Sequence, residues 1–189
     1  MRKINNMILV SGSGRNSGKT TLCCALIEAL SETGEVTAIK IAPHFHLTGK
    51  QQELTEQGPG YRIFVEKDTG TDKDTSRMLR AGAQTVYFVQ CADRGVEHAV
   101  RSLKRLLHDD RAIVCESGSL GLFFEPSYHV LVERPEPDMK KESYLLNKHR
   151  ADLIVGTGQI GIQLARKIIR SGKINIQEKQ YYDKDRRSA

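Results

Sequence analysis

Short apolar runs alternate with amphipathic stretches along most of this 189-residue chain. Several of the runs are apolar throughout, which is typical of strands buried on both faces of a sheet. Strands are predicted at residues 7–10, 36–41, 84–90, 112–115, 128–132 and 153–155. Helices are predicted at residues 18–32, 75–81, 96–108 and 160–170. Because strands and helices alternate, the pattern predicts an α/β fold with three layers and a mostly parallel central sheet.

Residues 44–74 do not follow this alternation. They are polar and glycine-rich, with one short β-like piece at residues 61–65. A connection of this length inside a compact domain is usually functional or mobile. A last edge strand is predicted at residues 173–177. We find no internal repeat and no low-complexity linker, so we expect residues 1–189 to form a single domain.

A glycine-rich turn joins the first predicted strand to the first predicted helix. Its sequence is Gly14-Arg15-Asn16-Ser17-Gly18-Lys19-Thr20-Thr21. A turn of this type in this position is the phosphate-binding P-loop, whose backbone N–H groups converge on phosphate oxygens at the positive end of a helix. We expect Lys19 to reach the outer phosphates and the Thr20 hydroxyl to hold Mg²⁺. The resulting fold would be that of a P-loop NTPase.

The turn departs from the consensus G-x-x-x-x-G-K-[ST] at its first glycine, which would fall at Ser13. Gly12 and Gly14 flank this position, so the backbone keeps much of its freedom. The alternative interpretation is a Gly/Ser-rich turn that precedes Lys-Thr by chance. The strand before it and the helix after it favour phosphate binding.

Three charged residues, Lys40, Asp74 and Glu116, lie at or next to the ends of predicted elements. Lys40 ends a β-rich run, where its charge needs a partner unless the side chain extends outward from an edge strand. Glu116 directly follows an apolar strand, the position of a Walker B carboxylate that binds Mg²⁺. Asp74 can either cap the short helix after it or bind Mg²⁺. Ligands of such sheets bind at the carboxyl ends of the strands.

Two histidines and two arginines have open interpretations. His44 and His46 share one face if the segment is extended, and they could contact phosphate, bind a metal, act as a base or simply lie on a surface loop. Arg77 and Arg80 share a helix face and either face an anionic ligand or are solvated.

Two further motifs compete with the P-loop. Residues 156–161 read G-x-G-x-x-G between a strand and a helix, as in dinucleotide-binding proteins. The chain ends too soon after them for that fold, so a glycine-rich turn that flanks the nucleotide base is favoured. Asn147-Lys148 is similar to the guanine-reading Asn-Lys-x-Asp, but Arg150 stands where Asp is needed.

The formal net charge of +6 admits an anionic ligand or nucleic acid. No aromatic residues alternate with the basic ones as a nucleic-acid stacking surface requires, so nucleic acid is not favoured. No apolar run reaches the length of a membrane helix, and no signal peptide is recognisable. The four cysteines lack metal-binding spacing and indicate reduced thiols in a cytoplasmic protein.

The ordered series of motifs resembles the P-loop family of the molybdopterin-guanine-dinucleotide biosynthesis protein MobB. The resemblance covers about the first two thirds of the chain. It consists of residues 16–22, Lys40 with the His44/His46 segment, residues 73–77 leading to residues 81–83, and the strand that ends in Glu116. The order is also similar to dethiobiotin synthetase. These resemblances imply that Thr20, Asp74 and Glu116 bind Mg²⁺, that Lys19 and Lys40 bind phosphate, and that the protein forms a homodimer.

The first hypothesis is therefore Mg²⁺-dependent binding and hydrolysis of GTP or ATP, with a MobB-like role beside a molybdenum-cofactor biosynthesis enzyme. Catalysis would consist of positioning and charge neutralisation, with Lys19, Lys40 and Glu116 as the catalytic residues. The second hypothesis is an ATP-dependent ligase or kinase of the dethiobiotin-synthetase type, in which residues 44–74 hold an organic acid. The third is a non-enzymatic adapter that binds nucleotide in order to dock a partner.

Overall fold

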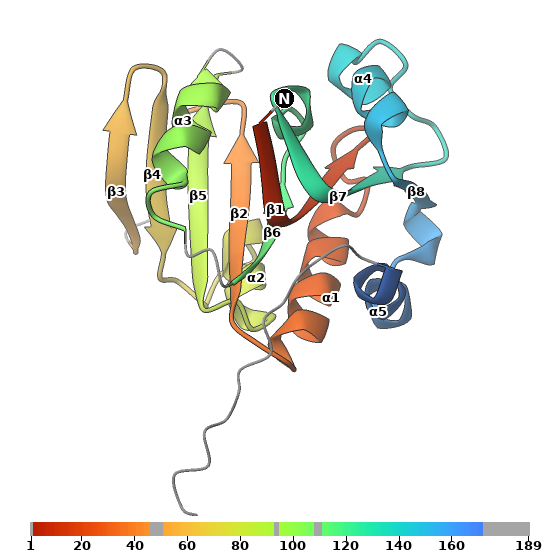
Figure 1. Cartoon of the computed structure of the whole chain (residues 1–189), viewed down its shortest axis with the longest axis horizontal. Helices are drawn as coiled ribbons and strands as arrows, with labels where there is room; N and C mark the ends of the chain where they lie inside the picture. Colours follow the sequence, from red (N-terminus) through yellow and green to blue (C-terminus); the bar gives the residue numbers. More distant parts are fainter. Residues whose placement is uncertain (1, 46–50, 93–94, 108–110, 172–189) are drawn as a thin grey trace, which may run out of the picture.

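The computed structural model describes residues 2–45, 51–92, 95–107 and 111–171, which form a three-layer α/β fold (Figure 1). The strands are β1 (Arg2–Gly12), β2 (Val36–Ala42), β3 (Gln52–Gly58), β4 (Tyr61–Glu66), β5 (Thr85–Cys91), β6 (Ala112–Glu116), β7 (Phe124–Glu133) and β8 (Leu153–Gly156). The helices are α1 (Lys19–Ser31), α2 (Asp74–Arg80), α3 (Val96–Leu103), α4 (Glu142–Arg150) and α5 (Ile162–Ser171), with single 3-10 turns η2 (Leu120–Leu122) and η3 (Thr157–Gln159).

All these strands belong to one eight-stranded sheet with the order β3-β4-β5-β2-β6-β1-β7-β8. In this order, every neighbouring pair between β5 and β8 is parallel. Among the described strands, only the pairs β3–β4 and β4–β5 are antiparallel. The prediction of an α/β fold with a mostly parallel sheet is therefore confirmed. The order places β1, which leads into the glycine-rich turn, beside β6, and β6 beside β2.

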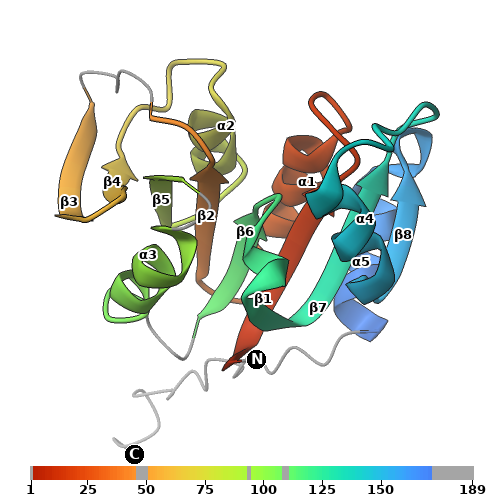
Figure 2. The same cartoon turned by 90° about the horizontal axis from the view of Figure 1, so that it is seen from above.

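Helices cover both faces of the sheet, which explains why several strands are apolar throughout. Successive residues of β1 enter opposite cores, Ile8 and Val10 on one face and Met7 and Leu9 on the other. Helices α1, α2 and α5 cover the first face, and α3 and η2 cover the second. Figure 2 shows α3 on the opposite side of the sheet from α1 and α2. Each fully buried aliphatic side chain contributes about 1.5–3 kcal/mol to folding.

The prediction that residues 44–74 form a loop with one short β-like piece is wrong for its middle part. Residues 52–66 form a hairpin that extends the sheet beyond β5 (Figure 1). Strand β4 contains the predicted piece at residues 61–65 and ends one residue later, at Glu66. Strand β3 lies at the edge and is mostly solvent-exposed. An edge strand of this kind needs no apolar face, so the sequence pattern did not reveal it.

Other element bounds differ from the expected ones by a few residues or more. Strand β1 begins at Arg2 rather than residue 7, and α3 ends at Leu103. Helix α4 was not predicted, because its sequence is largely polar and only Tyr144 and Asn147 are buried. The predicted edge strand at residues 173–177 lies outside the described residues.

Candidate functional site

The glycine-rich turn curves around the N-terminus of α1. Asn16 and Gly18 have positive φ angles of 55° and 92°. A Cβ atom on Gly18 would lie 2.5 Å from Cδ1 of Ile160, so both the φ angle and the lack of space favour glycine. Lys19 Nζ donates hydrogen bonds to the Gly14 carbonyl oxygen at 2.6 Å and to Ser17 Oγ at 3.2 Å. The ammonium group and the N-terminus of α1 thus both favour an anion at this turn.

Ser13, the departure from the P-loop consensus, has a structural role. It is fully buried, and its φ angle is not positive, so no glycine is needed there. Its Oγ accepts a hydrogen bond from the backbone N–H of Arg134 at 3.0 Å, and its own N–H donates to the Val132 carbonyl oxygen at 3.0 Å. The serine therefore ties the start of the turn to the end of β7.

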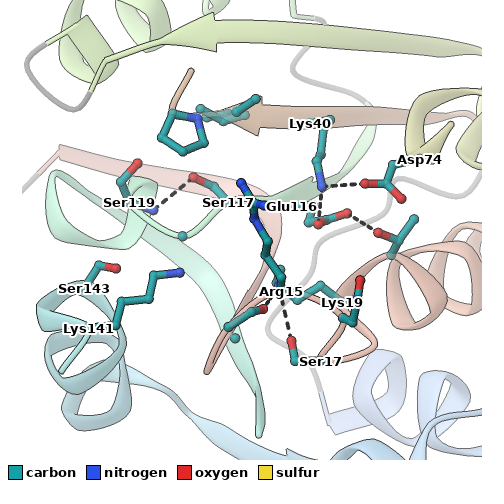
Figure 3. Close-up of a pocket in the computed structure, with 18 of the residues that line it drawn as sticks. Arg15, Ser17, Lys19, Lys40, Asp74, Glu116, Ser117, Ser119, Lys141 and Ser143 are labelled. Atoms are coloured by element: carbon teal, nitrogen blue, oxygen red, sulfur yellow. Dashed lines mark hydrogen bonds and ion pairs between the residues drawn. The ribbon is translucent and has the colours of Figure 1, made fainter. Parts of the chain in front are cut away.

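Four polar side chains from four elements meet beside this turn (Figure 3). Thr20 Oγ1 donates a hydrogen bond to Glu116 Oε2 at 2.8 Å. Lys40 Nζ forms an ion pair with Asp74 Oδ2 at 2.8 Å and a second one with Glu116 Oε1. Lys40 and Glu116 are direct partners in the register of β2 and β6, which explains why they meet. Asp74 starts α2, so the alternative that it only caps this helix does not describe its contacts.

Glu116 is the most deeply buried member of this cluster. Its side chain is 3% exposed, compared with 18% for Lys40 and 41% for Asp74. A carboxylate at this depth needs a positive partner or hydrogen-bond donors, and Lys40 and Thr20 supply both. The Asp74 and Glu116 carboxylates and the Thr20 hydroxyl are oxygen groups of the kind that Mg²⁺ prefers as ligands.

The ion pairs of the cluster favour the charged forms of Lys40 and Asp74. Burial lowers the pKa of Lys40, but the Glu116 and Asp74 carboxylates outweigh this effect and keep the pKa above its ordinary value. Burial raises the pKa of Asp74, but the ion pair with Lys40 lowers it below its ordinary value overall. Burial lowers the pKa of Lys19, and the Lys40 and Lys141 ammonium groups add to this against the opposing Glu116.

The cluster opens into a cavity with a volume of about 1040 Å³. All the residues predicted to bind nucleotide or metal line this cavity: Gly14, Arg15, Asn16, Ser17, Gly18, Lys19, Thr20, Thr21, Lys40, Asp74 and Glu116. His44 and Arg77 line it as well. His46 lies outside the described residues, so its predicted roles have no structural counterpart here.

The two competing motifs lie outside the cavity lining. Asn147 is buried in α4, where its amide donates to the carbonyl oxygens of Gly118 and Ser143. The G-x-G-x-x-G segment forms η3 after β8, and Thr157 Oγ1 donates to the Ser17 carbonyl oxygen at 3.1 Å. This segment therefore forms a second glycine-rich turn that is hydrogen-bonded to the first one.

Sequence reasoning missed several residues of the cavity wall. Ser117 and Ser119 follow β6, while Lys141 and Ser143 come from the start of α4. Ser117 and Ser119 could have been found, because they continue the strand that ends in Glu116. Lys141 and Ser143 carried no local signal, since α4 itself was not predicted.

No group of three or more His, Cys, Asp or Glu side chains that could hold a metal occurs in the described parts of the chain. Likewise, within these parts no helix has the length and apolar character needed to cross a membrane. Comparisons of the chain with protein-family models, with curated proteins and with solved structures gave no match.

Proposed function

We propose that this protein binds a purine nucleoside triphosphate with Mg²⁺ in the cavity and hydrolyses it, in a MobB-like role in molybdenum-cofactor biosynthesis. One observation carries the proposal. Side chains that are distant in sequence, Thr20, Lys40, Asp74 and Glu116, converge beside a P-loop at the carboxyl edge of a parallel sheet. The MobB-like role is supported by the resemblance described above.

The P-loop supplies the phosphate-binding part of the site. The residues at the N-terminus of α1, Lys19 among them, line the cavity. Together they neutralise the charge of a triphosphate chain. Lys40 adds a second ammonium group to the cavity lining.

The donor set of the cluster fits Mg²⁺. This ion prefers oxygen ligands and is usually bound through one or two carboxylates together with substrate phosphates. Thr20, Asp74 and Glu116 offer one hydroxyl and two carboxylates within one hydrogen-bonded group. These residues would hold the ion, which would supply additional charge neutralisation at the phosphates.

Hydrolysis in this site would depend on positioning and electrostatics. Lys19 and Lys40 would stabilise negative charge that develops on the transferred phosphoryl group. Glu116 and Asp74 provide acceptors that can orient an attacking water molecule. No step requires covalent chemistry by the protein.

The test is binding of a fluorescently labelled purine triphosphate with and without Mg²⁺. We expect Lys19→Ala to weaken binding by about 100-fold or more, because it removes a charge from the phosphate site. Lys104→Ala, at the end of α3 and away from the cavity, should bind like the wild type. Competition between unlabelled ATP and GTP then identifies the base. Wild-type protein that binds neither nucleotide in either metal condition contradicts the proposal.

A second variant separates the metal from the phosphate. Thr20→Val keeps the shape of the side chain but removes the hydroxyl group that contacts Glu116. We expect this variant to retain Mg²⁺-free binding and to lose most of the additional affinity that Mg²⁺ provides. An unchanged response to Mg²⁺ would remove Thr20 from the metal site.

A further inference from the structure

The cavity extends well beyond the P-loop and the carboxylate cluster. Its second compartment has two walls: the segment after β6 (Ser117, Gly118, Ser119 and Leu122) and the start of α4 (Lys141, Glu142, Ser143 and Leu146). Figure 3 shows Lys141 and Ser143 on the opposite side of the cavity from Asp74, with Arg15 between them. Because Ser117 directly follows Glu116, the second compartment adjoins the place of the terminal phosphate.

The two walls of this compartment are fixed to each other. Asn147 Nδ2 donates to the Gly118 carbonyl oxygen at 2.8 Å and to the Ser143 carbonyl oxygen at 2.7 Å. Asn147 is 2% exposed, and its Oδ1 is buried without a hydrogen-bond partner among the described residues. A buried oxygen without a hydrogen-bond partner lowers the free energy of unfolding. The Asn147 amide thus connects α4 to the segment after β6 although its oxygen destabilises the fold.

Cationic side chains without protein partners point into the compartment. In the described part of the chain, neither Lys141 nor Arg15 forms an ion pair or a side-chain hydrogen bond. Lys141 points from the start of α4 toward the centre of the cavity, and Arg15 rises from the P-loop into the same space (Figure 3). The Lys141 charge also acts on Lys19, whose pKa is lowered mainly by burial. Cations that converge in this way favour an anion between them.

The rest of the lining defines what kind of anion fits. Ser119 and Ser143 contribute hydroxyl groups beside the cations, whereas the Ser117 hydroxyl already accepts from the backbone N–H groups of Ser119 and Leu120. Leu122 and Leu146 add apolar surface. Glu142 is the carboxylate of this wall, and it is exposed to solvent. A ligand with one anionic end and an apolar body matches this lining better than a bare inorganic ion.

We propose that the second compartment binds a small organic anion, with a carboxylate or phosphonate-like group on Lys141 and Arg15 and its apolar part on Leu122 and Leu146. This inference rests on the proposed function, because it assumes that a nucleotide occupies the P-loop. It adds a second substrate, the organic anion, beside the terminal phosphate of that nucleotide. The ligase hypothesis expected residues 44–74 to hold such an acid. Of these, residues 52–66 form the hairpin at the far edge of the sheet, whereas His44 and Asp74 line the cavity.

The experiment is calorimetric titration of protein saturated with Mg²⁺ and a non-hydrolysable triphosphate, so that the P-loop is occupied. The probes are phenylphosphonate, benzoate and inorganic phosphate. We expect one equivalent of phenylphosphonate or benzoate to bind, about tenfold more tightly than inorganic phosphate, because of the apolar contacts. Lys141→Gln should weaken this binding by about tenfold or more. Lys148→Gln, on the same helix but outside the cavity lining, should bind like the wild type.

Three outcomes overturn the inference: no saturable binding of either organic probe, equal effects of the two lysine variants, or a Lys141→Gln variant that loses affinity for the triphosphate itself. The last outcome would assign Lys141 to the nucleotide. If the wild type binds no triphosphate, the proposed function fails by itself. The organic probes are then titrated into Lys19→Ala protein, where binding that depends on Lys141 still supports the second compartment and its absence contradicts it.

Discussion

Two carboxylates in different regions of the sheet are equally buried but are stabilised in different ways. Glu116 ends β6 and Glu66 ends β4, and each is 2% exposed. Glu116 is held by the Lys40 ammonium group and the Thr20 hydroxyl. Glu66 accepts hydrogen bonds from Thr75 Oγ1 and Gln52 Nε2, both at 2.6 Å, and from the backbone N–H groups of residues 67 and 68 at 3.1 and 3.0 Å. Among the described residues, no cation pairs with Glu66.

The different partners indicate different roles: Glu116 belongs to the candidate site, whereas Glu66 stabilises the fold. Glu116 faces the cavity, and its main partner is the ammonium group of a long side chain that can move toward another anion. Glu66 does not line the cavity, and its donors belong to the β3–β4 hairpin, the turn after it and the start of α2. Glu66 thereby fastens the hairpin to the helix that carries Asp74. We therefore expect changes at Glu66 to act on stability and changes at Glu116 to act on ligand binding.

The largest effect is expected from Glu66→Leu. The substitution removes the acceptor of the buried Thr75 hydroxyl and of the Asp68 N–H, whereas the Lys67 N–H keeps the Gln51 carbonyl oxygen as an acceptor. We expect the free energy of unfolding to fall by about 3–5 kcal/mol, since each buried unpaired donor costs about 1–3 kcal/mol and the hairpin loses its connection to α2. Urea denaturation measures this change. Glu53→Leu, at an exposed position of β3, is the matched control and should change stability by less than about 0.5 kcal/mol. Equal losses for both variants would contradict a structural role for Glu66.

Sequence reasoning found one of these two carboxylates and missed the other. Glu116 was predicted because an acid directly after an apolar strand has no structural explanation in a buried sheet. Lys40 was predicted by the same argument, and the structure pairs the two in register. Glu66 also directly follows a predicted β-like piece, residues 61–65, but this piece contains Arg62 and lies in a polar stretch, so the pattern did not indicate a buried strand. The donors of Glu66 come from separate segments, and only the fold brings these segments together.

The next effect in size is expected from Lys40→Met, which removes the cation between Asp74 and Glu116. Breaking a buried ion pair by deleting one partner costs about 3–4 kcal/mol near neutral pH. Without the lysine, Asp74 loses the ion pair that lowers its pKa, and burial then raises this pKa in the folded state. The folded variant then binds protons more readily than its unfolded chain, so its stability relative to the wild type should recover as the pH falls from 7 toward 4.

Urea denaturation of this variant and the wild type at several pH values measures the recovery. Lys148→Met is the control, because the Lys148–Glu133 pair is largely exposed and contributes about 1 kcal/mol or less. A stability deficit of Lys40→Met that stays constant or grows in acid would mean that the carboxylates of the cluster do not depend on Lys40. The comparison with Glu66 would then fail.

A third prediction concerns His129, because its protonation also changes the stability of the protein between pH 6.5 and 4. Burial lowers the pKa of His129 to about 4, against an ordinary value of 6.5. Its ring Nε2 lies 2.8 Å from the Oγ of buried Ser11. Because the folded pKa lies below the unfolded one, its contribution is complete above pH 6.5 and is lost as the pH falls to about 4, by up to about 3 kcal/mol.

His129→Gln should flatten this part of the stability profile, because glutamine keeps a polar contact to Ser11 but does not titrate. His149→Gln, at an exposed position of α4, should leave the profile unchanged. If the acid loss between pH 6.5 and 4 persists in His129→Gln, it arises from other groups. In that case the carboxylate comparison has to be made above pH 6.5.

The smallest effect is expected from Thr75→Val, which tests how strictly the two regions are separated. Thr75 is 3% exposed, and it directly follows Asp74. Valine keeps the shape of the side chain but removes one of the donors to Glu66, so we expect a loss of about 1–2 kcal/mol in urea denaturation. Nucleotide affinity with Mg²⁺ should stay within about twofold, because the backbone of α2 and the Asp74 carboxylate remain in place. Thr55→Val, exposed on β3, provides the control for the substitution itself. A variant that keeps its stability but loses Mg²⁺-dependent affinity would show that the Glu66 hydrogen bonds set the position of Asp74, and the structural carboxylate would then belong to the site.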